Sequence, residues 1–401
     1  MKLKASLVAA ALAAVSLTAG CANSGTTAAD TSSKTTNDSG PLKIGVIVPL
    51  SGEAGPNGKD VLQAIQAEVQ RLNQQGGVDG RTVKVIARDD KSTPATGVSA
   101  ATDLVSQDVD VVMGGWNSPV TLAMQPILVR GNVLNITSIP QSSEIIGGAD
   151  KDAIRMNAGN KVGGYVAAEF LAGNLHAKRI GLMLENDAYG TDAGDYVKQN
   201  LPAGSKIVTK QLFDYSATDF RVAISNLKSA NPDAVYSADA AESSGQPALM
   251  KQLAQANLGI PYFAAVGTVS QSVIDLAGDG ANGTYSADLY FPQADPWASN
   301  PQNQAFIKAF QQKTGRLPDK YAALGAESVD VWAQAVEKAG STDRDQVANA
   351  IKGHDFGDTV LGDVSFTSEG QMISPIYAFT VADQQVKVLN KIDVPQSVWM
   401  Q

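Results

Sequence analysis

The chain alternates short β-branched apolar runs with longer segments whose apolar residues recur at helical spacing. Residues 43–48 predict a buried strand, and Val61, Ile65 and Val69 within residues 59–72 predict a helix. Further strands are predicted at 82–87, 109–113 and 133–137, and further helices at 95–105 and 120–129. Strict alternation of strand and helix predicts a parallel sheet that helices cover.

The same alternation restarts in the middle of the chain. Strands are predicted at 179–184, 206–212 and 234–237, with helices at 162–174, 192–200 and 220–228. The remaining residues predict helices at 302–313, 321–338 and 344–351, then strands at 377–381 and 386–392. We therefore predict an α/β protein of two similar lobes, between which the chain crosses more than once. Such lobes can close on a ligand as a hinge does.

The amino-terminal segment predicts export. Residues 1–4 are basic, and an apolar run at 5–17 is shorter than the roughly 20 residues that a membrane span needs. Small residues precede Cys21, the only cysteine, and resemble a bacterial lipobox, although Thr18 stands where leucine is more usual. The resemblance implies a lipoprotein signal peptide at 1–20 and lipid on Cys21. An ordinary secretory signal with an unrelated cysteine is the alternative.

The segment after Cys21 lacks large apolar side chains. Residues 22–40 consist almost entirely of small and polar residues, so we predict a flexible tether over 21–40. Roughly 360 residues then remain, enough for two lobes of ordinary size. The formal net charge of −9 and the lack of a basic block argue against nucleic-acid binding.

Catalytic and metal-binding motifs are missing from the sequence. His176 and His354 have no acidic or thiol partners at motif spacing, so we predict no metal site and no histidine-based triad. The glycines at 278–283 match a dinucleotide motif in spacing but follow an apolar helix, so a plain loop is predicted. Asp89 and Asp90 are interpreted as a solvated loop. We predict neither catalysis nor a cofactor.

Ligands of open α/β sheets bind where strands end and helices begin. In the first lobe, Ser51 lies in a Ser-Gly turn that lets the backbone approach a ligand closely. Trp116, Asn117 and Ser118 follow the strand at 109–113. Ser118 is predicted as the N-cap of the next helix, whose free amides would attract a carboxylate, and Trp116 offers an apolar wall.

Further candidate ligand-binding residues follow later strands. Gln141 and Ser142 follow the strand at 133–137 and can donate or accept hydrogen bonds. In the second lobe, Tyr189 is placed to reach across the cleft, although a turn residue is the simpler interpretation. Asp239 or Glu242 would pair with a ligand ammonium unless both are merely solvated. Val266 would add an apolar surface.

Several segments together resemble type I periplasmic substrate-binding proteins, specifically the leucine/isoleucine/valine-binding family of ABC importers. These segments are the Pro-Leu-Ser-Gly turn at 49–52, residues 73–80, 89–90, 114–126, 187–190 and 321–324. The resemblance implies two Rossmann-like lobes with parallel sheets joined by a three-strand hinge. It places residues 41–158 plus 291–374 in the amino-terminal lobe, and 159–290 plus 375–401 in the carboxyl-terminal lobe.

The resemblance also implies roles for individual residues. Ser118 matches a serine that binds the ligand carboxylate, Gln141 or Ser142 matches a threonine that contacts the amino-acid head, and Tyr189 matches a tyrosine that closes over the ligand. Three positions depart from the family, namely Asn57 and Ala240, where aromatic residues are usual, and Val266, where a glutamate binds the ammonium. Either Asp239 or Glu242 replaces that glutamate, or the ligand has no ammonium.

The predicted function is therefore that of a receptor outside the cytoplasm. A membrane-anchored monomer would close on a branched-chain or other apolar amino acid and deliver it to an ABC permease. An aromatic acid or small amide is the alternative ligand, and a sensory receptor without transport is the alternative function. An enzyme on the same scaffold is a third possible function, and the scarcity of histidine and cysteine argues against it.

Overall fold

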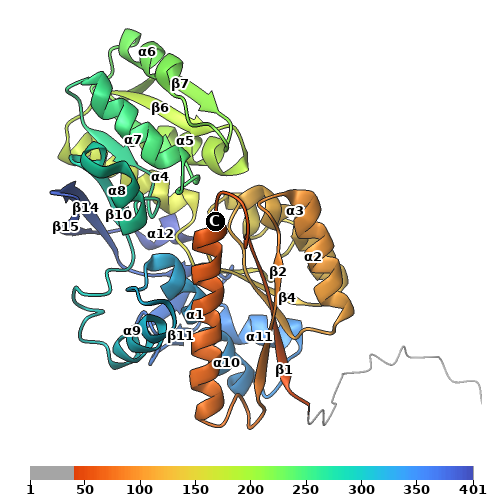
Figure 1. Ribbon diagram of the computed structural model, residues 1–401. Coiled ribbons are helices and arrows are strands. Elements are labelled where there is room, and N and C mark those ends of the chain that lie inside the picture. The colour runs from red at the N-terminus through yellow and green to blue at the C-terminus, as the bar shows by residue number, and fades with distance from the viewer. Residues whose placement is uncertain (1–39, 401) are drawn as a thin grey trace, which may run out of the picture. The chain divides into compact units, whose positions relative to one another are not determined.

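The computed structural model describes residues 40–400, so the predicted leader, Cys21 and almost all of the tether lie outside the described residues. The described residues form an α/β fold with two large sheets, one in each lobe (Figure 1). The predicted start of the folded region near residue 41 agrees with the first strand, which begins at Leu42.

The first sheet is parallel throughout and has the order β2-β1-β3-β4-β5. Its strands are β1 Leu42–Val48, β2 Val83–Asp89, β3 Val111–Gly114, β4 Leu134–Thr137 and β5 Ile154–Arg155. The helices between them are α1 Gly55–Gln74, α2 Pro94–Ser106 and α3 Ser118–Arg130. The strands are mostly buried, as apolar runs covered on both faces predict.

Three later helices extend this lobe. They are α9 Pro301–Thr314, α10 Lys320–Ala339 and α11 Arg344–Ile351. α10 lies along α1 and is buried over most of its length (Figure 1). A small antiparallel sheet follows, formed by β11 Asp355–Phe356, β12 Val364–Phe366 and β13 Met372–Ile373.

The second sheet has the order β15-β14-β10-β9-β8-β6-β7. Its strands are β6 Arg179–Glu185, β7 Lys206–Phe213, β8 Ala234–Ala238, β9 Tyr262–Ala264, β10 Thr284–Asp288, β14 Ile376–Ala382 and β15 Gln385–Ile392. The predicted parallel arrangement is confirmed for β6 to β10, but β14 runs antiparallel to both neighbours. Asp383 and Gln384 both have positive φ, a two-residue turn that joins β14 and β15 as a hairpin.

Helices also surround the second sheet. They are α4 Asn160–Ala168, which continues as a π-helical turn, α5 Ala188–Asn200, α6 Arg221–Ser229, α7 Gly245–Ala256, α8 Gln271–Ala277 and the short α12 Gln396–Trp399. The glycine-rich segment that was predicted as a loop begins with a 3₁₀ turn, Gly278–Ala281. Strands β1 to β5 form the first sheet and β6 to β10 lie in the second, to which β14 and β15 are added. The chain therefore passes from one lobe to the other after β5, after β10 and before β14.

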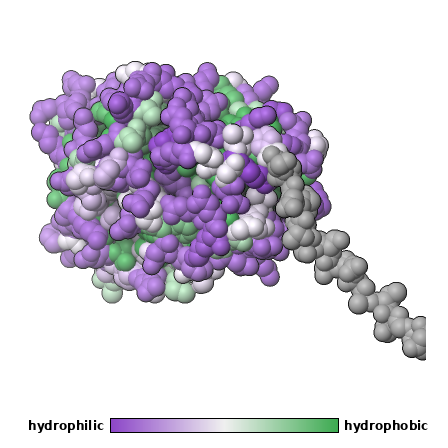
Figure 2. Space-filling model, turned by 90° about the horizontal axis from the view of Figure 1, so that it is seen from below, coloured by the Kyte–Doolittle hydropathy of each residue, from purple (hydrophilic) through white to green (hydrophobic). Residues whose placement is uncertain are grey.

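The face in Figure 2 is mostly hydrophilic, with hydrophobic residues in small separate areas. Among residues 40–400, no helix combines the length and apolar character that a bilayer crossing requires.

Candidate functional site

A cavity lies where loops from the two lobes meet at the carboxyl ends of the strands. The space free of protein atoms between these loops, including space open to solvent, is about 380 Å³, of which about 30 Å³ can hold the centre of a water molecule. The first lobe lines it with Trp116, Asn117, Ser118, Ile139, Pro140, Gln141 and Tyr321. The second lobe lines it with Glu185, Asp187, Tyr189, Ala240, Glu242 and Thr268.

Ser118 lies at the start of α3 but does not cap it. Asn117 occupies the N-cap position and makes no side-chain cap hydrogen bond, so the predicted N-cap at Ser118 is wrong by one residue. The Ser118 hydroxyl instead accepts backbone N–H groups of Gln141 at 3.3 Å and Ser142 at 3.2 Å. Because two donors occupy its lone pairs, the hydroxyl retains its proton for an acceptor in the cavity.

A buried arginine holds the Gln141–Ser142 loop from behind. Arg155 donates to the carbonyl oxygens of Gln141 at 3.2 Å and Ser142 at 2.7 Å. Burial lowers the pKa of Arg155 to about 10, which leaves it charged at neutral pH. The Gln141 side chain donates to the carbonyl of Val266 at 3.1 Å and so links the lobes. This side of the cavity therefore favours an anionic or accepting group.

The opposite wall is acidic. Glu185 ends β6 and Asp239 follows β8, the strand paired with β6, so the two buried carboxyls lie close together. The backbone N–H of Ala240 donates to Glu185, and that of Ala241 donates to Asp239 at 2.9 Å. Oε2 of Glu185 and Oδ2 of Asp239 receive no N–H donor from the described residues, and the two carboxyls share a hydrogen bond with each other.

Burial raises the pKa of both carboxyls. The pKa of Asp239 rises to about 7, and that of Glu185 rises well above its ordinary value, through burial first and then repulsion from Asp239 and Asp187. Asp187, half-buried at the start of α5, accepts the N–H groups of Tyr189 and Gly190 at 2.9 Å each. Burial raises the Asp187 pKa as well, so this wall holds protons more tightly than exposed carboxylates do.

Glu242 lies at the boundary of the lobes. The hydroxyl of Tyr321 donates to one carboxyl oxygen, and Asn57 and Ser270 donate to the other at 3.3 Å each. Burial raises the pKa of Glu242 well above its ordinary value, while the nearby charge of Lys320 opposes that rise. Asn57, a departure from the family pattern, thus contacts the acidic wall directly.

Aromatic side chains form the remaining walls. The rings of Trp116 and Tyr321 lie with their centroids 4.7 Å apart and tilted by 57°. Tyr189 is buried, and its hydroxyl has no hydrogen-bond partner among the described residues. A buried hydroxyl without a partner is costly, which indicates that a bound molecule or water satisfies it.

Some predicted residues lie outside the lining. Ser51 is exposed, and its hydroxyl donates to Asp89 at 2.6 Å. Ser142, Asp239 and Val266 lie directly behind the lining, where the contacts above place them. The predicted solvated loop at Asp89 and Asp90 is wrong for Asp90, which is fully buried, and burial raises its pKa to about 6.

Sequence reasoning missed part of the lining. Glu185 directly follows the predicted strand at 179–184, and a charged residue at the end of a buried strand was the available signal. Tyr321 was recognised only as part of a family segment. Asp187 likewise belonged to a family segment, 187–190, without a role of its own, and Thr268 carried no signal, because turns favour such residues everywhere. Within residues 40–400, no group of histidine, cysteine and acidic side chains is arranged to hold a metal ion.

Comparisons with known proteins agree on one family and one fold. A family model described as periplasmic binding protein matches residues 41–385. A protein from Brucella abortus named Leu/Ile/Val-binding protein homolog 1 is 27% identical over 335 residues, covering 83% of this chain and 88% of that protein.

Two solved structures share the fold. A leucine-binding protein from Thermotoga maritima superimposes with a TM-score of 0.79 at 24% identity, covering 88% of this chain and 99% of that one. A solute-binding protein of an ABC transporter from R. palustris, in complex with benzoate, has the same TM-score and identity and covers 88% and 96%.

Proposed function

The chain belongs to the periplasmic binding protein family, and from this premise we propose that it captures an amino acid-like solute outside the cytoplasm for an ABC permease. The observation that carries this proposal is a cavity with opposite polarity on its two sides. Ser118 presents a donor on one side, and Glu185, Asp187 and Glu242 present carboxyls on the other. A zwitterion matches both sides at once.

The donor side suits the solute carboxylate. The free proton of the Ser118 hydroxyl, the start of α3 and the buried charge of Arg155 all favour negative charge at this place. Gln141 and Ser142 position Ser118 through their backbone N–H groups. The carboxylate role that the resemblance gives to Ser118 is thus supported by its contacts.

The acidic wall suits the solute ammonium. Burying a carboxylate without a counter-charge is costly, and a bound ammonium removes that cost. No lysine, arginine or histidine within residues 40–400 forms an ion pair with the carboxyls that line the cavity. The ligand ammonium would therefore face Glu185, Asp187 and Glu242. These carboxyls would take over the role of the family's glutamate, which is Val266 in this chain.

An aromatic acid is the second candidate ligand. The Trp116–Tyr321 wall could stack on a flat ring, and a neighbour of the same fold was solved with benzoate. Such a ligand has no cation for the acidic wall, so its ring would leave the buried carboxyls uncompensated. The zwitterion is therefore the better match.

A thermal-shift screen tests the proposal. The full chain carrying Cys21→Ser is unfolded and refolded to remove bound solute, then mixed with amino acids, aromatic acids and small amides. A ligand at 100 times its Kd stabilises by about 2.7 kcal/mol, which raises Tm by several degrees. We expect amino acids to raise Tm. A rise in Tm with benzoate or amides but not with amino acids would contradict the zwitterion and favour a ligand without an ammonium.

The anchoring of the protein is a separate proposal. Removal of residues 1–20 and lipid attachment at Cys21 would hold the receptor on the outer side of a membrane. We propose that it acts there as a monomer, without chemical turnover, through lobes formed by 41–158 plus 291–374 and 159–290 plus 375–401. Cys21→Ser should move the protein from the membrane fraction to the soluble fraction. A native chain that is already soluble would contradict the anchor.

A further inference from the structure

We propose that the solute carries a second positive charge in addition to its α-ammonium, which makes basic amino acids the preferred class. This inference rests on the proposed function, because it concerns the same cavity. The observation behind it is the number of buried carboxyls around the cavity. Glu185, Asp239 and Glu242 are buried and Asp187 is half-buried, so an α-ammonium held at one of them leaves the others for a second cationic group.

Glu242 already has partners. Tyr321, Asn57 and Ser270 donate hydrogen bonds to its two oxygens, and Lys320 lies near enough to stabilise its charge. Lys320 itself donates to the carbonyl of Gly267 at 3.0 Å. Of the carboxyls in this wall, Glu242 thus has the most complete set of hydrogen bonds from the protein itself.

Glu185 and Asp239 are in the opposite situation. Each is about 1% exposed and has one oxygen that no N–H group of the described residues contacts, so the two side chains hydrogen-bond only to each other there. They follow Leu184 and Ala238, which are paired across β6 and β8, so sheet register fixes them side by side. The pair, together with Asp187, is a site for a cationic group.

An independent observation comes from Tyr189. This residue lines the same cavity and is 5% exposed, and its buried hydroxyl has no hydrogen-bond partner among the described residues. A guanidinium or ammonium presents several N–H donors, and a tyrosine oxygen can accept one of them while carboxylates accept the others. One cationic group would therefore satisfy the Tyr189 hydroxyl and replace the proton between Glu185 and Asp239.

The electrostatics agree with this placement. The other titratable groups that face the Glu185–Asp239 pair are acidic or phenolic, namely Glu53, Asp187, Tyr189, Tyr215 and Tyr262. Without a cation, the pair retains a proton near neutral pH, because its pKa values are raised. A bound cation lowers those values, so basic solutes should release protons on binding.

Paired ligands test the inference by isothermal titration calorimetry. Arginine is compared with citrulline, and lysine with norleucine, because each pair differs in charge far more than in shape. The refolded full chain carrying Cys21→Ser is used near pH 7 in buffers of different ionisation enthalpy. We expect the charged member to bind at least about tenfold more tightly, as one charged hydrogen bond allows. We also expect it to release protons.

Variants locate the effect. Glu185→Gln and, independently, Asp239→Asn should reduce the arginine-to-citrulline ratio and the proton release. Asp195→Asn, an exposed substitution on the same lobe, should leave both unchanged. The arginine-to-citrulline and lysine-to-norleucine affinity ratios are measured without either variant. Misfolding of a variant would therefore leave the main test intact.

The outcomes separate the two proposals. Leucine, citrulline or norleucine binding as tightly as the charged solutes would overturn the second charge but leave the amino-acid receptor intact. Binding of none of these amino acids would overturn the proposed solute class, and this inference with it. Binding of cadaverine as tightly as lysine would show that the carboxylate side at Ser118 is unused.

Discussion

At the scale of single residues, the site depends on groups whose hydrogen bonds are incomplete. Ser118 accepts two backbone N–H groups and keeps its own proton, whereas the Tyr189 hydroxyl has no partner among the described residues. Folding usually satisfies buried polar groups. Incomplete groups that line a cavity therefore indicate where a solute binds.

Ser118→Ala should weaken solute binding by about ten- to a hundredfold, because a hydrogen bond to a charged group contributes about 1.5–3 kcal/mol. Titration calorimetry with the solute found by the screen measures the change. Ser225→Ala, on an exposed turn of α6, is the matched control and should bind as the native chain does. Equal affinity of both variants would contradict the carboxylate role.

Tyr189→Phe should leave the free energy of unfolding of the ligand-free protein unchanged or raise it by about 1 kcal/mol, because it removes an unsatisfied buried hydroxyl. It should also reduce the rise in Tm that the solute causes. Tyr290→Phe is the contrasting variant, since that hydroxyl donates to Asn303 at 2.7 Å. It should destabilise the protein without altering the solute effect, and the opposite pattern would refute the role of Tyr189.

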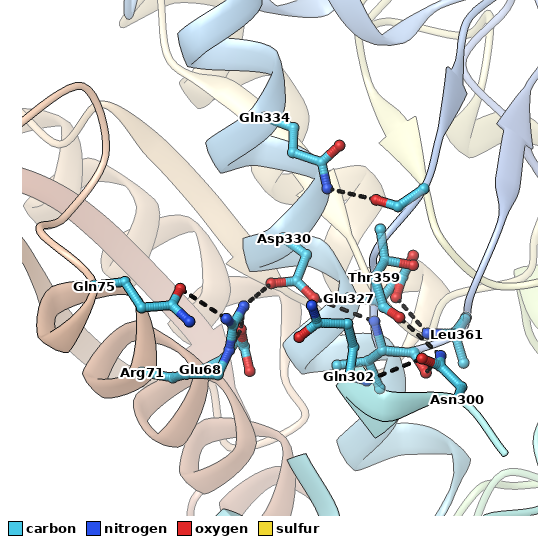
Figure 3. Close-up of polar contacts among 12 residues, drawn as sticks. Glu68, Arg71, Gln75, Asn300, Gln302, Glu327, Asp330, Gln334, Thr359 and Leu361 are labelled. Carbon is cyan, nitrogen blue, oxygen red and sulfur yellow. Dashed lines mark hydrogen bonds and ion pairs between the residues drawn. The ribbon is translucent and has the colours of Figure 1, made fainter. Parts of the chain in front are cut away.

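At the scale of elements, α1 and α10 hold a second acidic cluster, none of whose residues lines the cavity. Figure 3 shows Arg71 between Glu68 on α1 and Asp330 on α10, with Glu327 nearby. Arg71 lies 2.9 Å from Asp330, while Glu327 accepts the backbone N–H of Leu361 at 2.8 Å and a hydrogen bond from the Thr359 side chain. Arg71 pairs with two of these buried carboxyls, Glu68 and Asp330, whereas Glu327 forms no ion pair among the described residues, so burial favours its protonated form.

This cluster predicts a dependence of stability on pH. Burial raises the pKa of Glu327 from 4.5 to about 8 in the folded protein. The unfolded chain ionises at the lower value, so the stability that Glu327 contributes is complete below about pH 4.5 and is lost as the pH rises through about 8. The raised pKa of Asp330 acts in the same direction.

Glu327→Gln should therefore flatten the decline in free energy of unfolding between pH 5 and 9. Urea denaturation at pH values about one unit apart measures this decline. Above pH 8, the variant should gain most relative to the native chain, because glutamine cannot ionise there. Glu337→Gln, exposed on the same helix, is the control and should follow the native curve. Parallel curves for the native chain and Glu327→Gln would show that the pKa of Glu327 is the same in the folded and unfolded states.

At the scale of the whole molecule, direct hydrogen bonds join the lobes beside the cavity. Asp192 on α5 accepts the backbone N–H of Ser143 at 2.7 Å and its hydroxyl at 2.9 Å. Neither residue lines the cavity. These bonds therefore stabilise the closed arrangement without touching the solute.

Asp192→Ala should weaken solute binding about three- to tenfold, because the closed conformation becomes less populated and the apparent Kd rises in proportion. Small-angle X-ray scattering should show a larger radius of gyration without solute and the native value at saturation. Asp195→Ala, exposed on the same helix, should change neither quantity. Weaker binding with an unchanged radius at every solute concentration would point to a local effect.

The sequence determined the order of strands and helices and the place of the site. Alternation is a local property, and helices α1 and α10 lie within a few residues of the predicted ranges because helical spacing of apolar residues reports burial directly. The loops after strands could also be found, since parallel strands end at one edge. Ser118, Gln141 and Tyr189 were identified in this way and do line the cavity.

Only the tertiary structure decided which side chains meet there. Glu185 and Asp239 are brought together by the pairing of β6 with β8, and Trp116 meets Tyr321 because α10 returns to the first lobe. The structure also buries Asp90 and leaves Ser51 exposed, although both lie in polar turns. Burial and charge proximity depend on contacts between residues far apart in the chain, and local periodicity carries no information about them.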